Sequence, residues 1–137
     1  MKLIASTPAY TGAIDTFDSQ IEPGVLVVAN TDDPRELALE GVQRIDLHFP
    51  KFTDGRAFSQ AFLLSRRLGF KGAIRATGDV LIDQLAQMSR SGFTEAVLRA
   101  DQDLALATHT LSKYPGYAVG KYQGDAVEPA PHFLAAA

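Results

Sequence analysis

Residues 44–56 read Arg-Ile-Asp-Leu-His-Phe-Pro-Lys-Phe-Thr-Asp-Gly-Arg, and they decide the fold that we predict for this chain. The first part, residues 44–49, alternates polar and apolar side chains as a β-strand does. The loop that follows carries Lys51, Asp54 and Arg56 toward a helix-like segment. Ligands bind at the carboxyl ends of strands in open α/β sheets and in βα barrels. We therefore expect a functional site in this loop.

Strand-like and helix-like segments alternate along the chain with short connections between them. Helices are expected at about residues 34–40, 58–68, 81–91 and 104–111. Strands are expected at residues 3–5, 25–29, 44–49, 73–77 and 96–100, with a further edge strand at 117–123. Repeated βα units of this kind predict an α/β fold with a mainly parallel sheet of four or five strands.

One face of this sheet is predicted to be polar. Asp46 and His48 share one side of their strand, and the next two strands carry Arg75 and Arg99. Arg75 and Arg99 each lie four residues before an aspartate, Asp79 and Asp103, and this count gives the two arginines equal positions. Counted from the Gly-Phe pairs at residues 69–70 and 92–93, however, they differ by one residue and would lie on opposite faces. A sheet covered by helices on both faces is usually apolar throughout. We therefore favour a half-barrel, with a doubly wound flavodoxin-like sheet as the alternative.

Composition and charge predict a single soluble cytoplasmic domain. The chain has 137 residues, of which 46% are hydrophobic and 21% are charged. Residues 1–124 are assigned to one α/β domain, and residues 125–137 to a mobile or partner-dependent tail. The net charge of −3 offers nucleic acid no basic surface. No apolar run approaches the roughly 20 residues that span a membrane.

Several basic residues could bind an anion. Lys51 and Arg56 flank the loop after residue 49, and an arginine can hold an oxyanion through two hydrogen bonds. Arg75 and Arg99 extend this set. The pair Thr77-Gly78 adds backbone N–H groups at a strand-to-helix junction, where anions bind. The alternative is that the arginines form structural ion pairs with Asp46, Asp79 or Asp101.

The acidic residues have three possible roles. Asp54 or Asp79 could act as a general acid or base, and the Asp54-Gly55 pair could also form a plain turn. A helix cap is the favoured role for Asp79, and a turn is the favoured role for Gly55. Asp46, Asp79 and Asp101 form a weak candidate set for a hard cation such as Mg²⁺. His48 is expected to be a core histidine.

Familiar cofactor and catalytic motifs are missing. The sequence contains no G-x-G-x-x-G, P-loop, H-E-x-x-H or G-x-S-x-G motif. It also contains no cysteine, so it has neither a thiol nucleophile nor a cysteine-held iron–sulfur cluster. The identity of any cofactor stays unknown.

Between residues 49 and 103 the chain resembles an uncharacterised bacterial family, the domain of unknown function 934. The matching motifs, in order, are residues 49–56 (FPKFTDGR), 75–81 (RATGDVL), 83–85 (DQL), 92–93 (GF) and 98–103 (LRADQD). The genes of this family tend to lie beside those for sulfite or nitrite reductase, and its members are often labelled as oxidoreductases of sulfite reduction. The resemblance implies no catalytic residues.

Three functions are consistent with these observations. The leading hypothesis is an accessory protein of assimilatory sulfite reduction that binds sulfite reductase, another reductase subunit, a cofactor or an oxyanion. It predicts an exposed apolar patch near Phe52 or Phe133. The second is a small enzyme acting on an anionic metabolite, and the third is a structural interaction protein. In each case we expect a homo-oligomer, because a half-barrel leaves sheet edges to cover.

Overall fold

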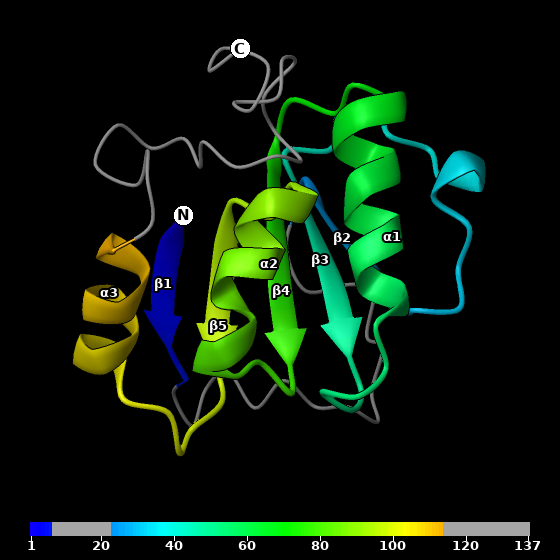
Figure 1. The fold of residues 1–137 in the computed structure, drawn as a ribbon. Helices are drawn as coiled ribbons and strands as arrows, with labels where there is room; N and C mark the ends of the chain where they lie inside the picture. The colour runs from blue at the N-terminus through cyan, green and yellow to red at the C-terminus, as the bar shows by residue number, and fades with distance from the viewer. Residues whose placement is uncertain (7–22, 114–137) are drawn as a thin grey trace, which may run out of the picture.

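The protein folds around an open parallel sheet. The computed structural model describes residues 1–6 and 23–113 (Figure 1). Within these residues the strands lie in the order β1-β5-β4-β3-β2, and every neighbouring pair is parallel. The strands are β1 (Lys2–Ala5), β2 (Val25–Val28), β3 (Arg44–Phe49), β4 (Ala73–Gly78) and β5 (Glu95–Leu98). The α/β class and the parallel sheet are confirmed, and the sheet is not closed.

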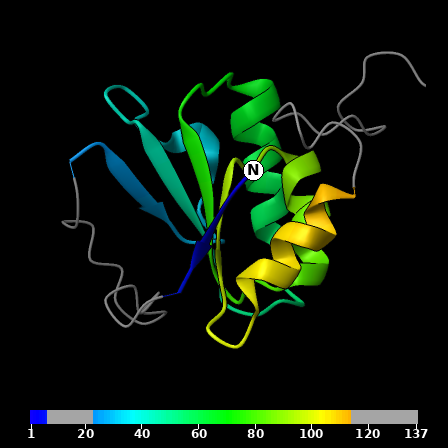
Figure 2. The same cartoon turned by 90° about the vertical axis from the view of Figure 1, so that its left-hand side faces the viewer.

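The three α-helices of the described residues cover the same face of the sheet (Figures 1 and 2). They are α1 (Arg56–Phe62), α2 (Leu85–Ser91) and α3 (Leu104–Ser112). Strands β2 to β5 follow one another in sequence and in space. Consecutive βα units with helices on one side are the arrangement of a barrel segment, whereas a doubly wound sheet has helices on both sides. The structure therefore agrees with the favoured half-barrel.

The core lies between the helices and one face of the sheet. Ile45, Leu47 and Phe49 alternate along β3 and are fully buried. The Phe49 ring lies 5.1 Å from the ring of Phe58 and 5.8 Å from that of Phe93, measured between centroids. The helices contribute apolar residues at helical spacing, namely Ala57, Ala61, Leu64, Leu85, Met88, Ala107 and Leu111.

The opposite face of the sheet is polar, as predicted. Asp46 is buried, and it lies beside Arg75 of β4, which in turn lies beside Glu95 of β5. Arg75 Nε donates to Glu95 Oε2 at 2.6 Å, and Arg44 Nε donates to Asp46 Oδ1 at 2.8 Å. These ion pairs lie across the sheet from the helices.

The strand register shows that Arg75 and Arg99 do not occupy equal positions in their strands. Arg75 is aligned with Glu95 of β5, and Arg99 lies four residues further along the chain, where its side chain binds Asp79. Arg75 pairs within the sheet, and Arg99 lies beyond the end of β5.

Several element boundaries also differ from the prediction. The helix expected at 34–40 is the short 3-10 helix η1 (Pro34–Glu36), capped by Asp33 as its sequence suggests. The helix expected at 58–68 begins at Arg56 as α1 and continues as the π-helical turn η2 (Leu63–Arg67). The helix expected at 81–91 begins with the 3-10 turn η3 (Ile82–Gln84). The strand expected at 117–123 and the tail 125–137 lie outside the described residues.

We predict that Gly78→Ala destabilises the protein well beyond the cost of its backbone conformation. Gly78 has a φ of +91°, and an added Cβ would overlap the Phe49 carbonyl oxygen and lie 2.6 Å from His48 Cε1. Gly41 is a matched control, because its φ is +76° and nothing lies within 4 Å of an added Cβ. Urea unfolding should show a loss of about 1 kcal/mol for Gly41→Ala and of about 3 kcal/mol for Gly78→Ala. Equal losses would contradict the close packing.

Candidate functional site

The loop between β3 and α1 is organised by Asp54. A turn with Phe52 and Thr53 at its centre brings the Asp54 N–H to the Lys51 carbonyl oxygen at 3.0 Å, so the Asp54-Gly55 pair follows this turn and does not form its centre. The Asp54 carboxylate accepts hydrogen bonds from Arg56 Nε at 3.0 Å and Nη2 at 2.7 Å, and from Asn30 Nδ2 at 2.9 Å. It also accepts the backbone N–H of Arg56 at 3.2 Å. This carboxylate therefore compensates the positive charge that Arg56 places at the start of α1.

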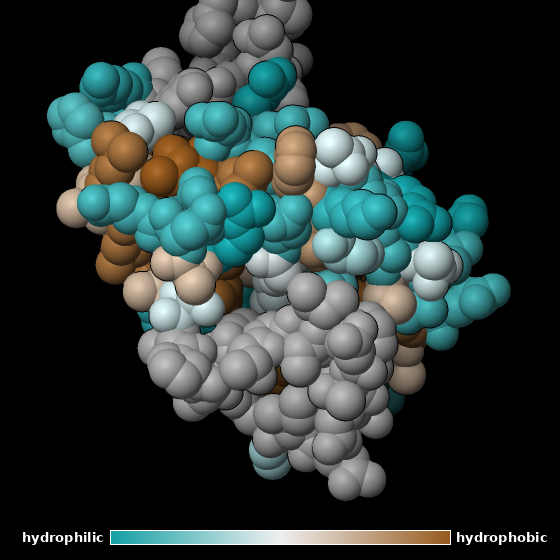
Figure 3. Space-filling model, turned by 90° about the horizontal axis from the view of Figure 1, so that it is seen from below, coloured by the Kyte–Doolittle hydropathy of each residue, from teal (hydrophilic) through white to brown (hydrophobic). Residues whose placement is uncertain are grey.

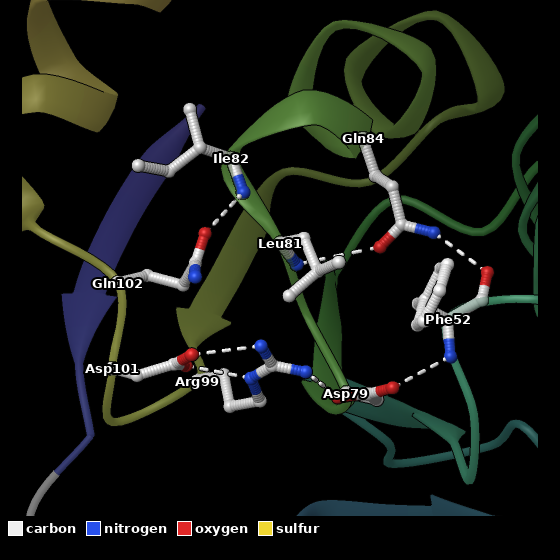
Figure 4. Close-up of polar contacts among 8 residues, drawn as sticks. All are labelled: Phe52, Asp79, Leu81, Ile82, Gln84, Arg99, Asp101 and Gln102. Atoms are coloured by element: carbon white, nitrogen blue, oxygen red, sulfur yellow. Dashed lines mark hydrogen bonds and ion pairs between the residues drawn. The ribbon is translucent and has the colours of Figure 1, made fainter.

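The carboxylate of Asp79 joins this loop to the other strand ends (Figure 4). The Phe52 N–H donates to Asp79 Oδ2 at 2.7 Å, and Arg99 Nη1 donates to Asp79 Oδ1 at 2.7 Å. Its predicted role as a helix cap is wrong, because Leu81 occupies the N-cap position of η3 and Gln84 that of α2. The loops after β3 and β5 both reach this side chain, so it serves as a tertiary link.

Two glutamine side chains complete the link. Gln84 Nε2 donates to the Phe52 carbonyl oxygen at 2.9 Å, while its Oε1 accepts the Leu81 N–H at 3.3 Å. Gln102 Oε1 accepts the Ile82 N–H at 3.0 Å (Figure 4). We call the set Phe52, Asp79, Gln84, Arg99, Asp101 and Gln102 the strand-end network.

The charges of this region neutralise one another. Arg99 donates to Asp101 through Nε at 2.6 Å and Nη2 at 2.8 Å, in addition to its bond with Asp79. Hydrogen bonds from Arg99 lower the pKa of Asp101 to about 2, and hydrogen bonds from Arg56 lower that of Asp54 to about 2. The same bonds raise the pKa of both arginines. Asp54 and Asp101 are therefore ionised and paired at neutral pH.

The predicted anion-binding residues do not form one site. Arg75 lies within the polar sheet face and pairs with Glu95. Thr77 is buried, with its Oγ1 3.3 Å from His48 Nδ1. Around Gly78 the backbone packs against β3, which leaves its Cα no open space toward Phe49. Lys51 is exposed and forms no ion pair with any residue in the described ranges.

The three aspartates proposed for a cation are also separated. Asp46 lies within β3 and pairs with Arg44, whereas Asp79 and Asp101 both bind Arg99. Among residues 1–6 and 23–113, no group of three His, Cys, Asp or Glu side chains is placed to hold a metal ion.

The sequence hypothesis did anticipate the exposure of Phe52, and it overlooked two amides. Phe52 is 49% exposed. Asn30 and Gln102 were not considered, although each lies just after a strand. The repeated Asp-Gln pair at residues 83–84 and 101–102 was the available signal, because both of its glutamines bind backbone N–H groups of the segment after β4.

Comparison with protein families matches residues 24–133 to a family described as bacterial protein of unknown function, DUF934. The chain belongs to this family. The matched region includes the whole strand-end network and reaches beyond residues 49–103 on both sides. No curated protein and no solved structure matches the chain. No helix within the described residues is long and apolar enough to cross a membrane.

We predict that Asp79→Ala destabilises this DUF934 protein by about 1–2 kcal/mol, because a charged acceptor for the Phe52 N–H and for Arg99 is lost. Asp83→Ala is the control, since Asp83 is exposed nearby. Its effect should stay within about 0.5 kcal/mol. Urea unfolding compares the two variants, and equal stabilities would contradict the linking role of Asp79.

We also predict an acid-induced loss of stability between about pH 4 and pH 2. Asp54 and Asp101 have pKa values of about 2 in the folded protein, against about 3.9 for an unfolded aspartate. The unfolded chain binds more protons in this window, so stability falls as the pH falls. In thermal melts the double variant Asp54→Asn/Asp101→Asn should show a shallower decline below pH 4. A decline as steep as that of the wild type would contradict this assignment.

Proposed function

We propose that this protein is an accessory protein of assimilatory sulfite reduction in the cytoplasm, and that it binds its partner through the edge of the sheet that carries Phe52. The observation that carries the proposal is the way Phe52 is held. Its side chain is 49% exposed, while its N–H is bound by Asp79 and its carbonyl oxygen by Gln84 (Figure 4).

This arrangement suits a binding anchor. A phenylalanine that is exposed to water lacks the favourable free energy of burial in an apolar environment. An aromatic side chain at the centre of an interface recovers that free energy and contributes strongly to affinity. A loop that is already ordered loses less entropy when the complex forms. The bonds from Asp79 and Gln84 order the Phe52 backbone before any partner arrives.

The electrostatics of the same edge support binding over acid–base catalysis. A general acid or base works best with a pKa near the working pH. The pKa of Asp54 and of Asp101 is instead about 2. Arg56 and Arg99, which an enzyme would need for an anionic substrate, are each bound by carboxylates.

The proposed partner is sulfite reductase or another subunit of the reductase system, on the ground of the gene neighbourhood that the family implies. Lys51 directly precedes Phe52 in the same turn and is exposed. A partner surface with an apolar pocket beside a carboxylate would fit this pair.

Growth of a strain that lacks the gene tests the proposal. The strain should fail on sulfate and on sulfite as sole sulfur source and should grow on cysteine. Complementation should be lost with Phe52→Ala and weakened with Lys51→Ala, while the melting temperatures of both stay within about 2 °C of wild type because both side chains are exposed. Leu68→Ala is the control, since Leu68 is 41% exposed outside this edge, and it should complement fully.

Two outcomes would contradict the proposal. Normal growth of the deletion strain on all three sulfur sources would remove the link to sulfite reduction. Full complementation by Phe52→Ala would exclude Phe52 as the anchor. Isothermal titration of the purified protein with purified sulfite reductase then measures the contact directly, and wild type should bind at least about tenfold more tightly than Phe52→Ala.

A further inference from the structure

A second exposed apolar surface lies on the outer side of α1 and η2. It is an open groove of about 490 Å³ lined by Phe58, Ser59, Phe62, Leu63 and Arg67. Phe62 is 41% exposed, and the Arg66 guanidinium carbon lies 5.9 Å from the centre of its ring. We call this surface the basic groove.

The charged side chains of α1 and η2 are all basic. No aspartate or glutamate occurs from Gly55 to Gly78, whereas Arg66, Arg67 and Lys71 are all exposed. No carboxylate of the described residues forms an ion pair with these three cations. The groove therefore offers an apolar floor with a positive rim.

The start of α3 carries the complementary surface. Leu104 and Leu106 are 38% and 54% exposed, and the exposed carboxylate of Asp103 directly precedes Leu104, whereas that of Asp101 is paired with Arg99. No lysine or arginine occurs between Asp101 and Ser112. Figure 3, which looks onto the carboxyl ends of the strands, shows hydrophobic atoms gathered on the α3 side with hydrophilic atoms beside them. We call this surface the acidic tip.

We infer that copies of this chain associate head to tail, with the acidic tip of one copy seated in the basic groove of the next. In each copy α2 lies between α1 and α3, so the groove on α1 and the tip on α3 are separated by a helix within one molecule (Figure 1). Leu104 and Leu106 supply apolar side chains for the groove, and Asp103 brings a negative charge to the rim of Arg66 and Arg67. Opposite charges around an apolar contact favour this pairing over like with like.

The geometry has a definite consequence for assembly. Two different surfaces meet in a head-to-tail contact, so every copy keeps one unused surface until a ring closes or a chain grows. The assembly should therefore be larger than a dimer at high concentration. It should weaken as salt is raised to about 0.5 M, because exposed charges are screened.

Two single-surface variants test this inference. Phe62→Asp places a negative charge in the basic groove and leaves the acidic tip intact, whereas Leu106→Arg does the reverse. By sedimentation velocity at about 100 µM and low salt, wild type should be oligomeric and each variant alone monomeric. An equimolar mixture of the two variants should form a dimer, because one copy retains the groove and the other the tip.

Controls separate this contact from misfolding and from the proposed function. Phe52→Asp changes an exposed aromatic side chain outside both surfaces and should leave the oligomer unchanged. The double variant Arg66→Glu/Arg67→Glu reverses the charge of the groove by changing exposed residues only. It replaces Phe62→Asp in the experiment if Phe62→Asp lowers the melting temperature. Three results would each overturn the inference. They are a monomeric wild type, an oligomer that persists in both single-surface variants, and variants that do not form a dimer when mixed. The last of these results would indicate a symmetric contact instead.

Discussion

The carboxylate of Asp79 is the contact on which the carboxyl edge of this sheet depends. It follows β4 directly and binds the Phe52 N–H from the loop after β3 and Arg99 from the loop after β5. Loops after adjacent parallel strands meet at one edge of a sheet, so one side chain there can hold two neighbours. Without it, the Phe52 N–H would lose its acceptor and Arg99 would keep Asp101 alone as its ionic partner.

This contact changes the meaning of the charges at the edge. Residues that would serve a ligand in many α/β proteins are here engaged with one another, as with Arg56 and Asp54 or Arg99 and Asp101. Phe52 is an exposed apolar side chain at this edge, and both the N–H and the carbonyl oxygen of its backbone are hydrogen-bonded. Residues of the family motifs at this edge therefore bind one another and hold the loops in place.

The ion pairs on the polar face of the sheet help to fix the strand register. The Arg75–Glu95 and Arg44–Asp46 pairs are largely buried, and burying charges costs desolvation even when they are paired. Their alternation with core residues still serves specificity, because a slip of one residue in β3 would drive Asp46 into the helix-covered core. The face thus penalises wrong registers.

Local patterns in the sequence were enough to predict the strand at residues 44–49, its two faces, the helix cap at Asp33 and the parallel α/β class. These features depend on side-chain periodicity and on hydrogen bonds within a few residues, which a single sequence displays. The partner of Asp79 and the offset between Arg75 and Arg99 were decided only by the tertiary structure. Both depend on how neighbouring strands are aligned and on which loops then meet, and strand alignment is a property of packing between segments distant in the chain.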